Sequence, residues 1–271
     1  MLRKIAGHPV EVVEVGEGRP VLFLHGFPLD HRGLLRSVGP VFERRRGYRR
    51  FHVDLPGFGS SPAAQDIGST DDVIEFILGL IDEWIADQRF LLVGESWGGY
   101  LVRAVIRERP EQVIGMALIV PMTVPDHAAR RTPPQATLVE EPGLLASLDP
   151  ADAVDFMELA VIADRPAWDY YDAAVLAPFA AADPETTARI EAHYGSSRGV
   201  DDAPPFDGPS LIVVGRQDSA VGYTDALALV ERFPRSTFAI LDAAGHNLSG
   251  ERRGLLAALM DDWLDRVEAE A

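Results

Sequence analysis

Short apolar runs recur along the first 120 residues, and segments with helical spacing of apolar residues lie between them. The runs Val21–Leu24 and Phe90–Val93 are uninterrupted, which is typical of strands buried on both faces of a sheet. Further strands are indicated at Val10–Val15, Arg50–Val53 and Ile114–Val120. Helices are indicated at Gly33–Arg46, with a break at Gly39-Pro40, after a cap at Ser69 or Thr70, and at Leu101–Arg109. This alternation predicts an α/β fold with a mainly parallel sheet.

The alternation stops at Pro121 and resumes after Pro209, and this stretch holds 12 of the 20 prolines. Proline separates short helices because it cannot sit in a helix interior. The helices predicted here are Ala151–Ala163, Ala167–Ala180 and Glu185–Tyr194. Beyond it, we predict strands at Leu211–Val214 and Thr237–Leu241 and helices at Thr224–Phe233 and Arg252–Val267. The predicted organisation is therefore a core of residues 1–120 and 210–271 with a helical cap, or lid, inserted at residues 121–209.

The strand Phe90–Val93 runs directly into Gly94-Glu95-Ser96-Trp97-Gly98. A serine at the apex of a sharp strand-to-helix turn, with glycine two residues to either side, has the form of a nucleophile elbow. The glycines are needed because a side chain there would crowd the adjoining strand and helix. The hydroxyl lies near a helix N-terminus, where backbone N–H groups favour negative charge. We predict that Ser96 is a catalytic nucleophile.

A nucleophilic serine needs a base, and His246 is the best placed of seven histidines. It follows the last predicted strand and so belongs at the same carboxyl edge of the sheet as Ser96. His25 also ends a strand at that edge, but the Gly-Phe-Pro after it indicates a role in shaping the backbone. His52 lies within a strand and is expected to pack in the core. The histidines with less supporting context are His8, His31, His127 and His193.

An acid that orients the base is expected between Ser96 and His246 in the chain. Asp218 follows the next-to-last strand, again at the carboxyl edge, and is the preferred candidate. A turn or helix-capping aspartate would also fit this local sequence. Asp126, which follows the strand before the cap, is the rival candidate. Two further acids are less well placed, namely Asp225 and Asp242.

The tetrahedral intermediate of acyl transfer needs hydrogen-bond donors for its oxyanion. One predicted donor is the backbone N–H of Trp97, directly after the nucleophile. The second is the backbone N–H of Phe27, in the loop after Val21–Leu24, and Gly26 lets that loop pass close to the elbow. Because both donors are main-chain groups, the side chains of Phe27 and Trp97 are free to line an acyl pocket.

Composition excludes several classes of protein. The chain carries 42 acidic and 25 basic side chains, and a formal net charge of −17 argues against nucleic acid as a partner. With no cysteine, it has no disulfide, thiolate metal site or cysteine nucleophile. No apolar run approaches a membrane span, and the start lacks the apolar stretch of a signal peptide. We expect a cytoplasmic monomer or homodimer that requires no metal or organic cofactor.

Five motifs, in this order and each at a predicted strand end, resemble those of the α/β-hydrolase superfamily. They are His25-Gly26-Phe27-Pro28, Asp54-Leu55-Pro56-Gly57-Phe58-Gly59-Ser60-Ser61, Gly94-Glu95-Ser96-Trp97-Gly98-Gly99, Gly215-Arg216-Gln217-Asp218 and Gly245-His246. The resemblance implies an eight-stranded sheet flanked by helices, a lid after the sixth strand, and the triad Ser96, Asp218 and His246. Glu251 also looks like the family's usual continuation after the histidine.

The identity of the nucleophile separates this chain from similar groups. Haloalkane dehalogenases and epoxide hydrolases are similar around His25-Gly26, but their nucleophile is Asp, and Ser96 cannot form the alkyl–carboxylate ester that they require. The Ser96-Trp97 pair is similar to proline iminopeptidases, although Phe27-Pro28-Leu29 departs from their pattern. Serine-type haloperoxidases and C–C bond hydrolases share the same scaffold.

These residues predict a serine hydrolase that cleaves a carboxylic ester, or a related acyl compound, through an acyl-enzyme. The expected partner is a small, uncharged and partly apolar acyl substrate. The alternatives are an aminopeptidase of the iminopeptidase kind and a hydrolase-fold ligand receptor with little turnover. A group of large cap residues either lines the pocket or packs the cap helices together, namely Phe156, Met157, Trp168, Tyr170, Tyr171 and Phe179.

Overall fold

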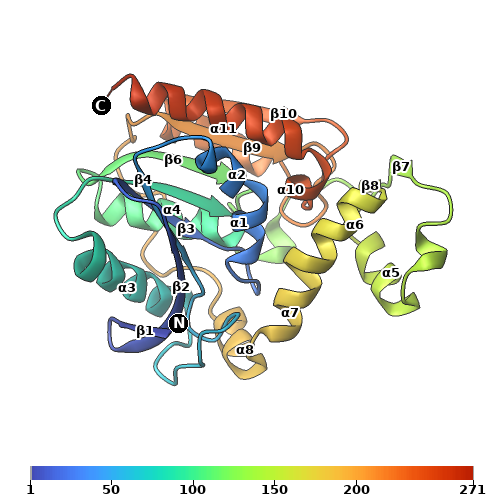
Figure 1. Cartoon of the computed structure of the whole chain (residues 1–271), viewed down its shortest axis with the longest axis horizontal. Coiled ribbons are helices and arrows are strands. Elements are labelled where there is room, and N and C mark those ends of the chain that lie inside the picture. Colours follow the sequence, from blue (N-terminus) through green and yellow to red (C-terminus); the bar gives the residue numbers. More distant parts are fainter. Residues whose placement is uncertain (1, 271) are drawn as a thin grey trace.

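A single eight-stranded sheet forms the centre of the molecule. The structure is a computed structural model that describes residues 2–270. The strands of the sheet are β1 (Leu2–Ile5), β2 (His8–Val15), β3 (Arg19–Leu24), β4 (Tyr48–Val53), β5 (Phe90–Glu95), β6 (Val113–Ile119), β9 (Ser210–Gly215) and β10 (Ser236–Leu241). They lie in the order β1-β2-β4-β3-β5-β6-β9-β10 (Figure 1). β2 pairs antiparallel with β1 and β4, and all later neighbours are parallel, which confirms the predicted fold class.

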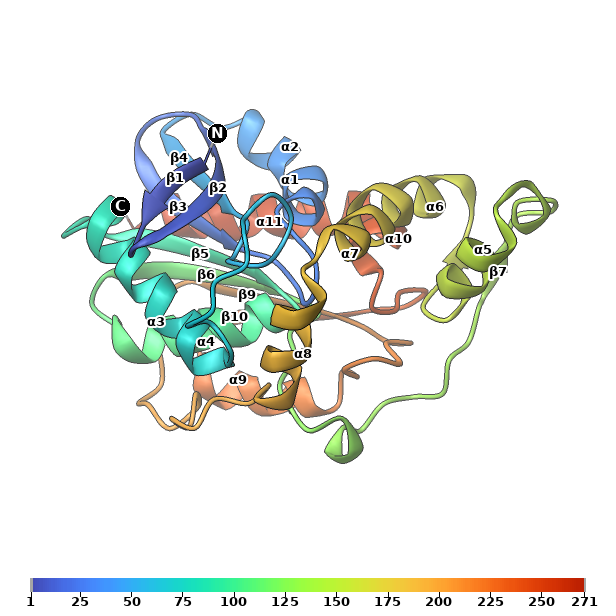
Figure 2. The ribbon, with the colours of Figure 1, turned by 90° about the horizontal axis from the view of Figure 1, so that it is seen from below.

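Helices cover both faces of this sheet (Figure 2). One face carries α1 (Arg32–Ser37), α2 (Gly39–Glu43) and α11 (Arg253–Glu268), and the other carries α3 (Thr70–Leu80) and α4 (Trp97–Glu108). β5 shows why its sequence is an uninterrupted apolar run. Phe90 and Leu92 pack in the core on the α3 and α4 side, whereas Leu91 and Val93 pack on the opposite side. Each residue of such a strand therefore needs an apolar side chain.

Between β6 and β9 the chain leaves the sheet and forms a largely helical insertion beside the carboxyl ends of the strands (Figures 1 and 2). Its elements are β7 (Val139–Glu140), α5 (Pro150–Met157), β8 (Ile162–Ala163), α6 (Arg165–Tyr171), α7 (Ala177–Ala181) and α8 (Pro184–Ala192). Phe156, Trp168 and Tyr171 form a small apolar cluster within the insertion, separate from the two cores of the sheet. The division into a core domain and a cap at residues 121–209 stays a prediction.

Several predicted elements differ from those observed. β1 was not predicted, and β7 and β8 were not predicted either. The break expected at Gly39-Pro40 is observed between α1 and α2. The helix expected at Ala167–Ala180 is continuous, with a π-helical segment at Asp172–Leu176 between α6 and α7. The helix expected at Thr224–Phe233 is divided into a 3₁₀ turn at Asp225–Ala228 and the one-turn helix α9 (Leu229–Arg232). The final helix is likewise preceded by a separate short helix, α10 (Leu248–Glu251). The spacing of apolar residues does not reveal such breaks, because a helix that is divided still buries the same face.

The helix predicted at Ala151–Ala163 is wrong in its second half, because α5 ends at Met157 and the chain becomes extended toward β8. The cause lies 90 residues further along the chain. The carboxylate of Glu251 accepts hydrogen bonds from the backbone N–H groups of Val161 (2.7 Å) and Ile162 (3.2 Å). Its other oxygen accepts from the Gly245 N–H at 2.7 Å. Glu251 therefore ties the insertion to the loop that carries His246.

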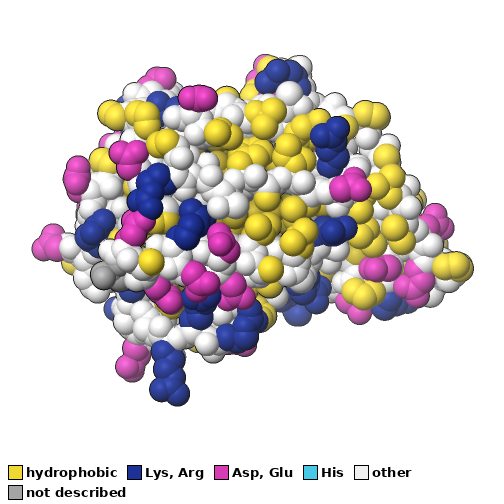
Figure 3. Space-filling view, turned by 90° about the horizontal axis from the view of Figure 1, so that it is seen from above, with side chains coloured by type: hydrophobic (Ala, Val, Ile, Leu, Met, Phe, Trp, Pro, Cys, Tyr) yellow, Lys and Arg dark blue, Asp and Glu magenta, His cyan; other side chains and the backbone are white. Residues whose placement is uncertain are grey.

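Hydrophobic side chains also reach the surface, where they gather over the middle and right of the face seen from above, with most charged side chains at its left and rim (Figure 3). The exposed large hydrophobic residues are spread over the sheet edge, the last helix and the insertion, and include Ile240, Leu255, Val154 and Phe179. Of the helices within residues 2–270, none has both the length and the apolar character that a bilayer crossing requires.

Candidate active site

Ser96 occupies a strained turn between β5 and α4. Its backbone has φ 53° and ψ −117°, in the region that side-chain-bearing residues rarely adopt. The Ser96 N–H donates to the Ile119 carbonyl at 3.0 Å and holds the turn against β6. A side chain at Gly98 would collide with the Leu24 carbonyl, and one at Gly94 would collide with the Gly98 carbonyl. Because of this tight packing, only glycine fits at these two positions.

Ser96, His246 and Asp218 are brought together by three different strands. The Ser96 Oγ lies 3.0 Å from Nε2 of His246, and Nδ1 of His246 lies 2.9 Å from Oδ2 of Asp218. An ionised carboxylate only accepts hydrogen bonds, so Nδ1 carries the proton toward Asp218 and Nε2 is left to accept from the serine. This is the arrangement in which a histidine can take the hydroxyl proton.

Burial and hydrogen bonding set the charges of the Asp218–His246 pair. Burial would raise the pKa of Asp218, but the charge of His246, its hydrogen bond, and the N–H groups of Val221 and Ala220 lower that pKa below the ordinary value. Burial acts to lower the pKa of His246, and Asp218, followed by Glu95, raises it above 6.5. The pair therefore favours an ionised aspartate that stabilises a protonated imidazole.

The other candidate acids lie elsewhere. Asp126 is exposed and accepts a hydrogen bond from the Ala128 N–H at 3.0 Å, where it caps a 3₁₀ turn. Asp225 is bonded to Arg131, and Asp242 accepts from the Gln217 side chain. His246 Nδ1 contacts Asp218 instead of any of these.

Two of the remaining histidines are buried in the sheet region. Nε2 of His25 accepts from the Leu55 N–H at 3.1 Å, and Nδ1 donates to the Gly26 carbonyl at 2.8 Å, so burial lowers its pKa and the neutral ring braces the loop after β3. His52 stacks on Phe23 with ring centres 4.0 Å apart, and burial lowers its pKa to about 3. Both observations agree with the shaping and packing roles that the sequence predicts.

The predicted oxyanion donors flank the elbow. A Cβ built on Gly26 would lie 3.4 Å from the Ser96 Cβ, so the loop that carries the Phe27 N–H passes directly beside the nucleophile. The ring of Phe27 lines the cavity at Ser96. The prediction that the Trp97 ring is free to line the pocket is wrong. Trp97 is fully buried beneath the cavity, where its Nε1 donates to Thr70 Oγ1 at 3.2 Å and its ring packs near Phe58.

Ser96 and His246 open into a cavity of about 250 Å³ between the sheet and the insertion. At the liquid-water spacing of about 30 Å³ per molecule, this space holds on the order of eight water molecules. Its apolar lining comes from the loop after β3 and from the insertion, namely Phe27, Pro28, Leu29, Leu159, Ala174, Val175 and Phe179. Of the large cap residues, Tyr170, Tyr171 and Phe179 line the cavity, whereas Phe156 and Trp168 pack within the insertion.

Two polar residues of the cavity, Glu95 and Asn247, were not predicted to belong to the site, and they line it beside Ser96 and His246. They are the chain neighbours of the nucleophile and the base, and this adjacency is the signal that would have identified them. Tyr170, for which the sequence left pocket lining and cap packing both open, reaches the cavity from the insertion.

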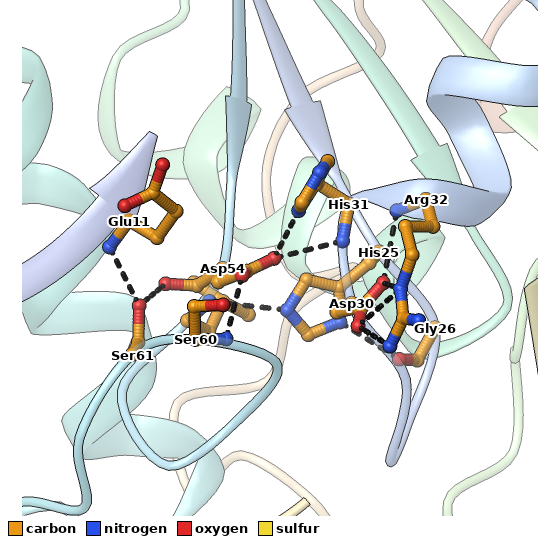
Figure 4. A network of polar contacts seen from close by, with 10 residues as sticks. Glu11, His25, Gly26, Asp30, His31, Arg32, Asp54, Ser60 and Ser61 are labelled. Atoms are coloured by element: carbon orange, nitrogen blue, oxygen red, sulfur yellow. Dashed lines mark hydrogen bonds and ion pairs between the residues drawn. The ribbon is translucent and has the colours of Figure 1, made fainter. Parts of the chain in front are cut away.

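A second polar network supports the loop after β3 (Figure 4). Oδ1 of Asp54 accepts from the backbone N–H of His31 at 2.9 Å and lies 2.6 Å from its Nδ1, and Oδ2 accepts from the Ser60 N–H at 2.9 Å. The neighbouring Asp30 is held by Arg32. Figure 4 shows these side chains converging from the loops after β3 and β4, so the network fixes the loop that carries Phe27.

Asp30, His31 and Asp54 also place three potential metal ligands within 4.8 Å of one another, as judged over residues 2–270. The carboxylate of Asp30 is already paired with the cationic Arg32, and both oxygens of Asp54 have donors. A cation would have to displace these donors and lie beside a guanidinium. The cluster is therefore a hydrogen-bond network and carries no metal assignment.

Comparisons with known proteins agree with this architecture. Residues 21–259 match the model of the alpha/beta hydrolase family, and the chain belongs to that family. It is 30% identical over 249 residues to a pimeloyl-[acyl-carrier protein] methyl ester esterase of Aeromonas hydrophila, covering 88% of this chain and 92% of that protein. An alpha/beta superfamily hydrolase from Oenococcus oeni PSU-1 has a TM-score of 0.89 and 27% identity, with 99% of each chain covered. A thermophilic esterase from Thermogutta terrifontis shares the fold, with a TM-score of 0.76, 23% identity, and coverage of 98% of this chain and 99% of that one.

Proposed function

We propose that this protein is a serine hydrolase that cleaves a small carboxylic ester through an acyl-enzyme. The observation that carries the proposal is the hydrogen-bonded series from Asp218 through His246 to Ser96, which opens into a mainly apolar cavity. The similarity over most of the chain to a protein named as a methyl ester esterase supports ester cleavage in particular.

In the first step, Nε2 of His246 removes the Ser96 proton as Oγ attacks the ester carbonyl carbon. Asp218 keeps the imidazole in the required tautomer and stabilises its protonated form. The protonated Nε2 then gives its proton to the leaving alkoxide, so that an alcohol departs and the acyl group stays on Ser96. Water repeats the sequence, with His246 again as base, and releases the acid.

The oxyanion formed in each step is stabilised by the backbone N–H groups of Phe27 and Trp97. The close approach of Gly26 to Ser96 supports the first assignment, and the position of Trp97 at the first turn of α4 supports the second. Loss of one such donor costs about 3 kcal/mol of transition-state stabilisation in related chemistry. Both groups belong to the backbone, so substitution of either side chain leaves the donor in place.

The cavity favours a small and largely uncharged acyl substrate. Its volume of about 250 Å³ lies near the lower end of ligand pockets, and its wall is mostly apolar. The formal charge of −17 also disfavours polyanionic partners.

The decisive experiment is labelling with a fluorophosphonate, which reacts with activated serines, in the wild type and in Ser96→Ala. We expect labelling of the wild type only, and hydrolysis of p-nitrophenyl acetate or butyrate that falls at least a thousandfold in the variant. Labelling that persists in Ser96→Ala would remove Ser96 from the mechanism.

Two matched substrate tests distinguish the alternative functions. Proline p-nitroanilide cleaved faster than every ester would assign the protein to the aminopeptidases. Labelling of Ser96 without turnover of any ester or anilide would instead indicate a ligand receptor built on the hydrolase fold.

A further inference from the structure

Asn247 is a buried amide without a partner. It is only 5% exposed, and among residues 2–270 neither Nδ2 nor Oδ1 has a hydrogen bond. A buried amide that makes no hydrogen bond lowers the stability of the fold, so proteins rarely keep one without a reason. The side chain also leaves the turn before α10 uncapped, because it accepts no hydrogen bond from that helix.

Asn247 lies at the wall of the cavity that contains Ser96, and its amide atoms are buried within that wall. Asn247 follows His246 directly in the chain and lines the same cavity. A Cβ built on Gly250 would lie 2.8 Å from the Tyr170 ring and 3.2 Å from Nδ2 of Asn247, so the amide lies close to the Tyr170 side of the cavity. The absence of a side chain at Gly250 keeps room for both.

Glu95 adds a second polar group to this wall. Its Oε1 accepts a hydrogen bond from the Ser249 hydroxyl at 2.6 Å, and within the described part of the chain Oε2 has no hydrogen bond. Burial raises the pKa of Glu95, against the opposing influences of Ser249 and His246, and so favours its neutral form. The otherwise apolar wall therefore includes two polar residues, Asn247 and Glu95, and both lie near Tyr170.

The chemistry of an amide defines what it recognises. Nδ2 donates and Oδ1 accepts, and the two atoms point in the same direction from one planar group. Both are satisfied together by a ligand group that presents an acceptor and a donor side by side. A primary carboxamide or a cyclic amide has this pattern, whereas a ketone or an ether presents only an acceptor.

We infer that Asn247, assisted by Glu95, forms a specificity subsite that selects acyl substrates carrying a neutral amide group. This inference rests on the proposed ester hydrolysis at Ser96 and adds the substrate feature that the apolar lining does not explain. The subsite lies within the cavity, so the amide and the ester carbonyl belong to one small molecule.

Three nearly isosteric methyl esters test the selection. Methyl succinamate carries a carboxamide, methyl 4-oxopentanoate replaces the NH₂ by a methyl group, and monomethyl succinate replaces it by a charged oxygen. Each is assayed by acid release, together with the series that is one carbon longer. We expect kcat/KM of the wild type to favour the amide ester over the ketone ester by about tenfold in one of the two series, as one added hydrogen bond implies.

The variant Asn247→Leu keeps the shape of the side chain and removes both polar atoms, and we expect its amide-to-ketone ratio to fall to about one. Leu159→Val is the matched control at an apolar position of the same cavity. It should change the rates for both esters together and leave their ratio unchanged. Because the amide has no partner to lose, Asn247→Leu should melt no lower than the wild type, which separates lost selection from lost folding.

A second measurement does not depend on turnover. Asn247 is the single asparagine of the sequence, so selective ¹⁵N-asparagine labelling gives one side-chain NH₂ pair in the NMR spectrum. In the Ser96→Ala protein, methyl succinamate should shift this pair clearly more than methyl 4-oxopentanoate, whose carbonyl can accept from Nδ2 but whose methyl group cannot donate to Oδ1.

An equal response of the NH₂ pair to both esters, or a wild-type ratio near one in both series, overturns the amide subsite. Preference for monomethyl succinate overturns it in favour of a carboxylate subsite. Failure of the proposed function looks different, because then no ester is turned over and Ser96 is not labelled, while the NH₂ pair still reports whether the amide binds.

Discussion

Two aspartate–histidine pairs at the carboxyl edge of the same sheet have nearly the same chemistry and different consequences. Asp218 and His246 are 2.9 Å apart, and Asp54 and His31 are 2.6 Å apart. In both pairs the aspartate is buried after a strand, and the partner raises the pKa of the histidine above its ordinary value, although burial acts to lower it. The bond between Asp and His therefore does not by itself mark a catalytic site.

The difference lies at the second ring nitrogen. Nε2 of His246 faces the hydroxyl of Ser96 at 3.0 Å. Nε2 of His31 makes no hydrogen bond within residues 2–270, and the pair instead joins the loops after β3 and β4 through Asp54. One pair is arranged to move a proton, and the other holds the loop that carries the Phe27 N–H. Matched substitutions of the two aspartates separate these roles.

The largest effect is expected for Asp218→Asn. The asparagine NH₂ can donate to Nδ1 of His246 and favour the wrong tautomer, and the neutral amide does not balance a protonated imidazole, so kcat/KM for an ester substrate should fall by roughly 10³–10⁴-fold. The measurements are steady-state hydrolysis and thermal unfolding of the variant. The control is the wild type at the same concentration of sites that react with fluorophosphonate. A loss below tenfold would show that another group orients His246.

Asp54→Asn should act mainly on stability. Asparagine has one side-chain acceptor oxygen in place of two. Its NH₂ group must therefore face either His31 or the Ser60 N–H, so that two hydrogen-bond donors point at each other in a buried place. We expect a loss of about 3 kcal/mol in the free energy of unfolding by urea. The activity of the folded fraction should fall by about tenfold or less, through looser positioning of the Phe27 N–H. A loss of activity as large as that of Asp218→Asn, with unchanged stability, would reverse the assignment of the two pairs.

The pH dependence of the two pairs should separate activity from stability. His246 must be neutral to act as a base, so kcat/KM should rise with pH through a pKa above 6.5. A histidine whose pKa is raised by folding stabilises the protein fully below its unfolded pKa, near 6.5, and this contribution is lost as pH rises through the folded pKa.

His31→Asn isolates this second effect. The difference in unfolding free energy between the wild type and His31→Asn should be largest below about pH 6.5 and shrink at higher pH. The unfolding free energy of His31→Asn must be subtracted from that of the wild type, because the lowered pKa values of His25 and His52 make the stability of both proteins depend on pH in the opposite direction. The activity profile of His31→Asn should keep the pKa of the wild type, and a shift of that pKa would mean that the two pairs are coupled.

The smallest effect is expected for Asp126→Asn. Asp126 is exposed and caps a short turn, so kcat/KM should stay within about twofold of the wild type and stability within about 1 kcal/mol. The same assay as for Asp218→Asn provides the comparison. A loss of several orders of magnitude would make Asp126 the acid of the mechanism in place of Asp218.

Much of this architecture is predictable because it depends on short segments. The central strands β3, β5, β6 and β9 each contain an apolar run, and the elbow needs small residues at Gly94 and Gly98, where any side chain would meet backbone atoms. Ser96, Asp218 and His246 are also predictable as a set, since residues just after parallel strands share one edge of the sheet.

Other features depend on segments far apart in the chain. The Trp97 ring points into the core toward Thr70, although its position beside the nucleophile suggests the pocket. The extended chain at Val161 and Ile162 is set by Glu251, some 90 residues away. Local spacing carries no information about such partners.

The sequence by itself determined the α/β sheet, the strained turn at Ser96 and the order of nucleophile, acid and base, because periodicity and turn chemistry are local properties. Only the tertiary structure decided which of Tyr170, Phe156 and Trp168 reaches the cavity, and that the Asn247 amide is buried without a partner. Those facts follow from how the insertion folds back over the sheet edge, where each contact joins residues that no local pattern connects.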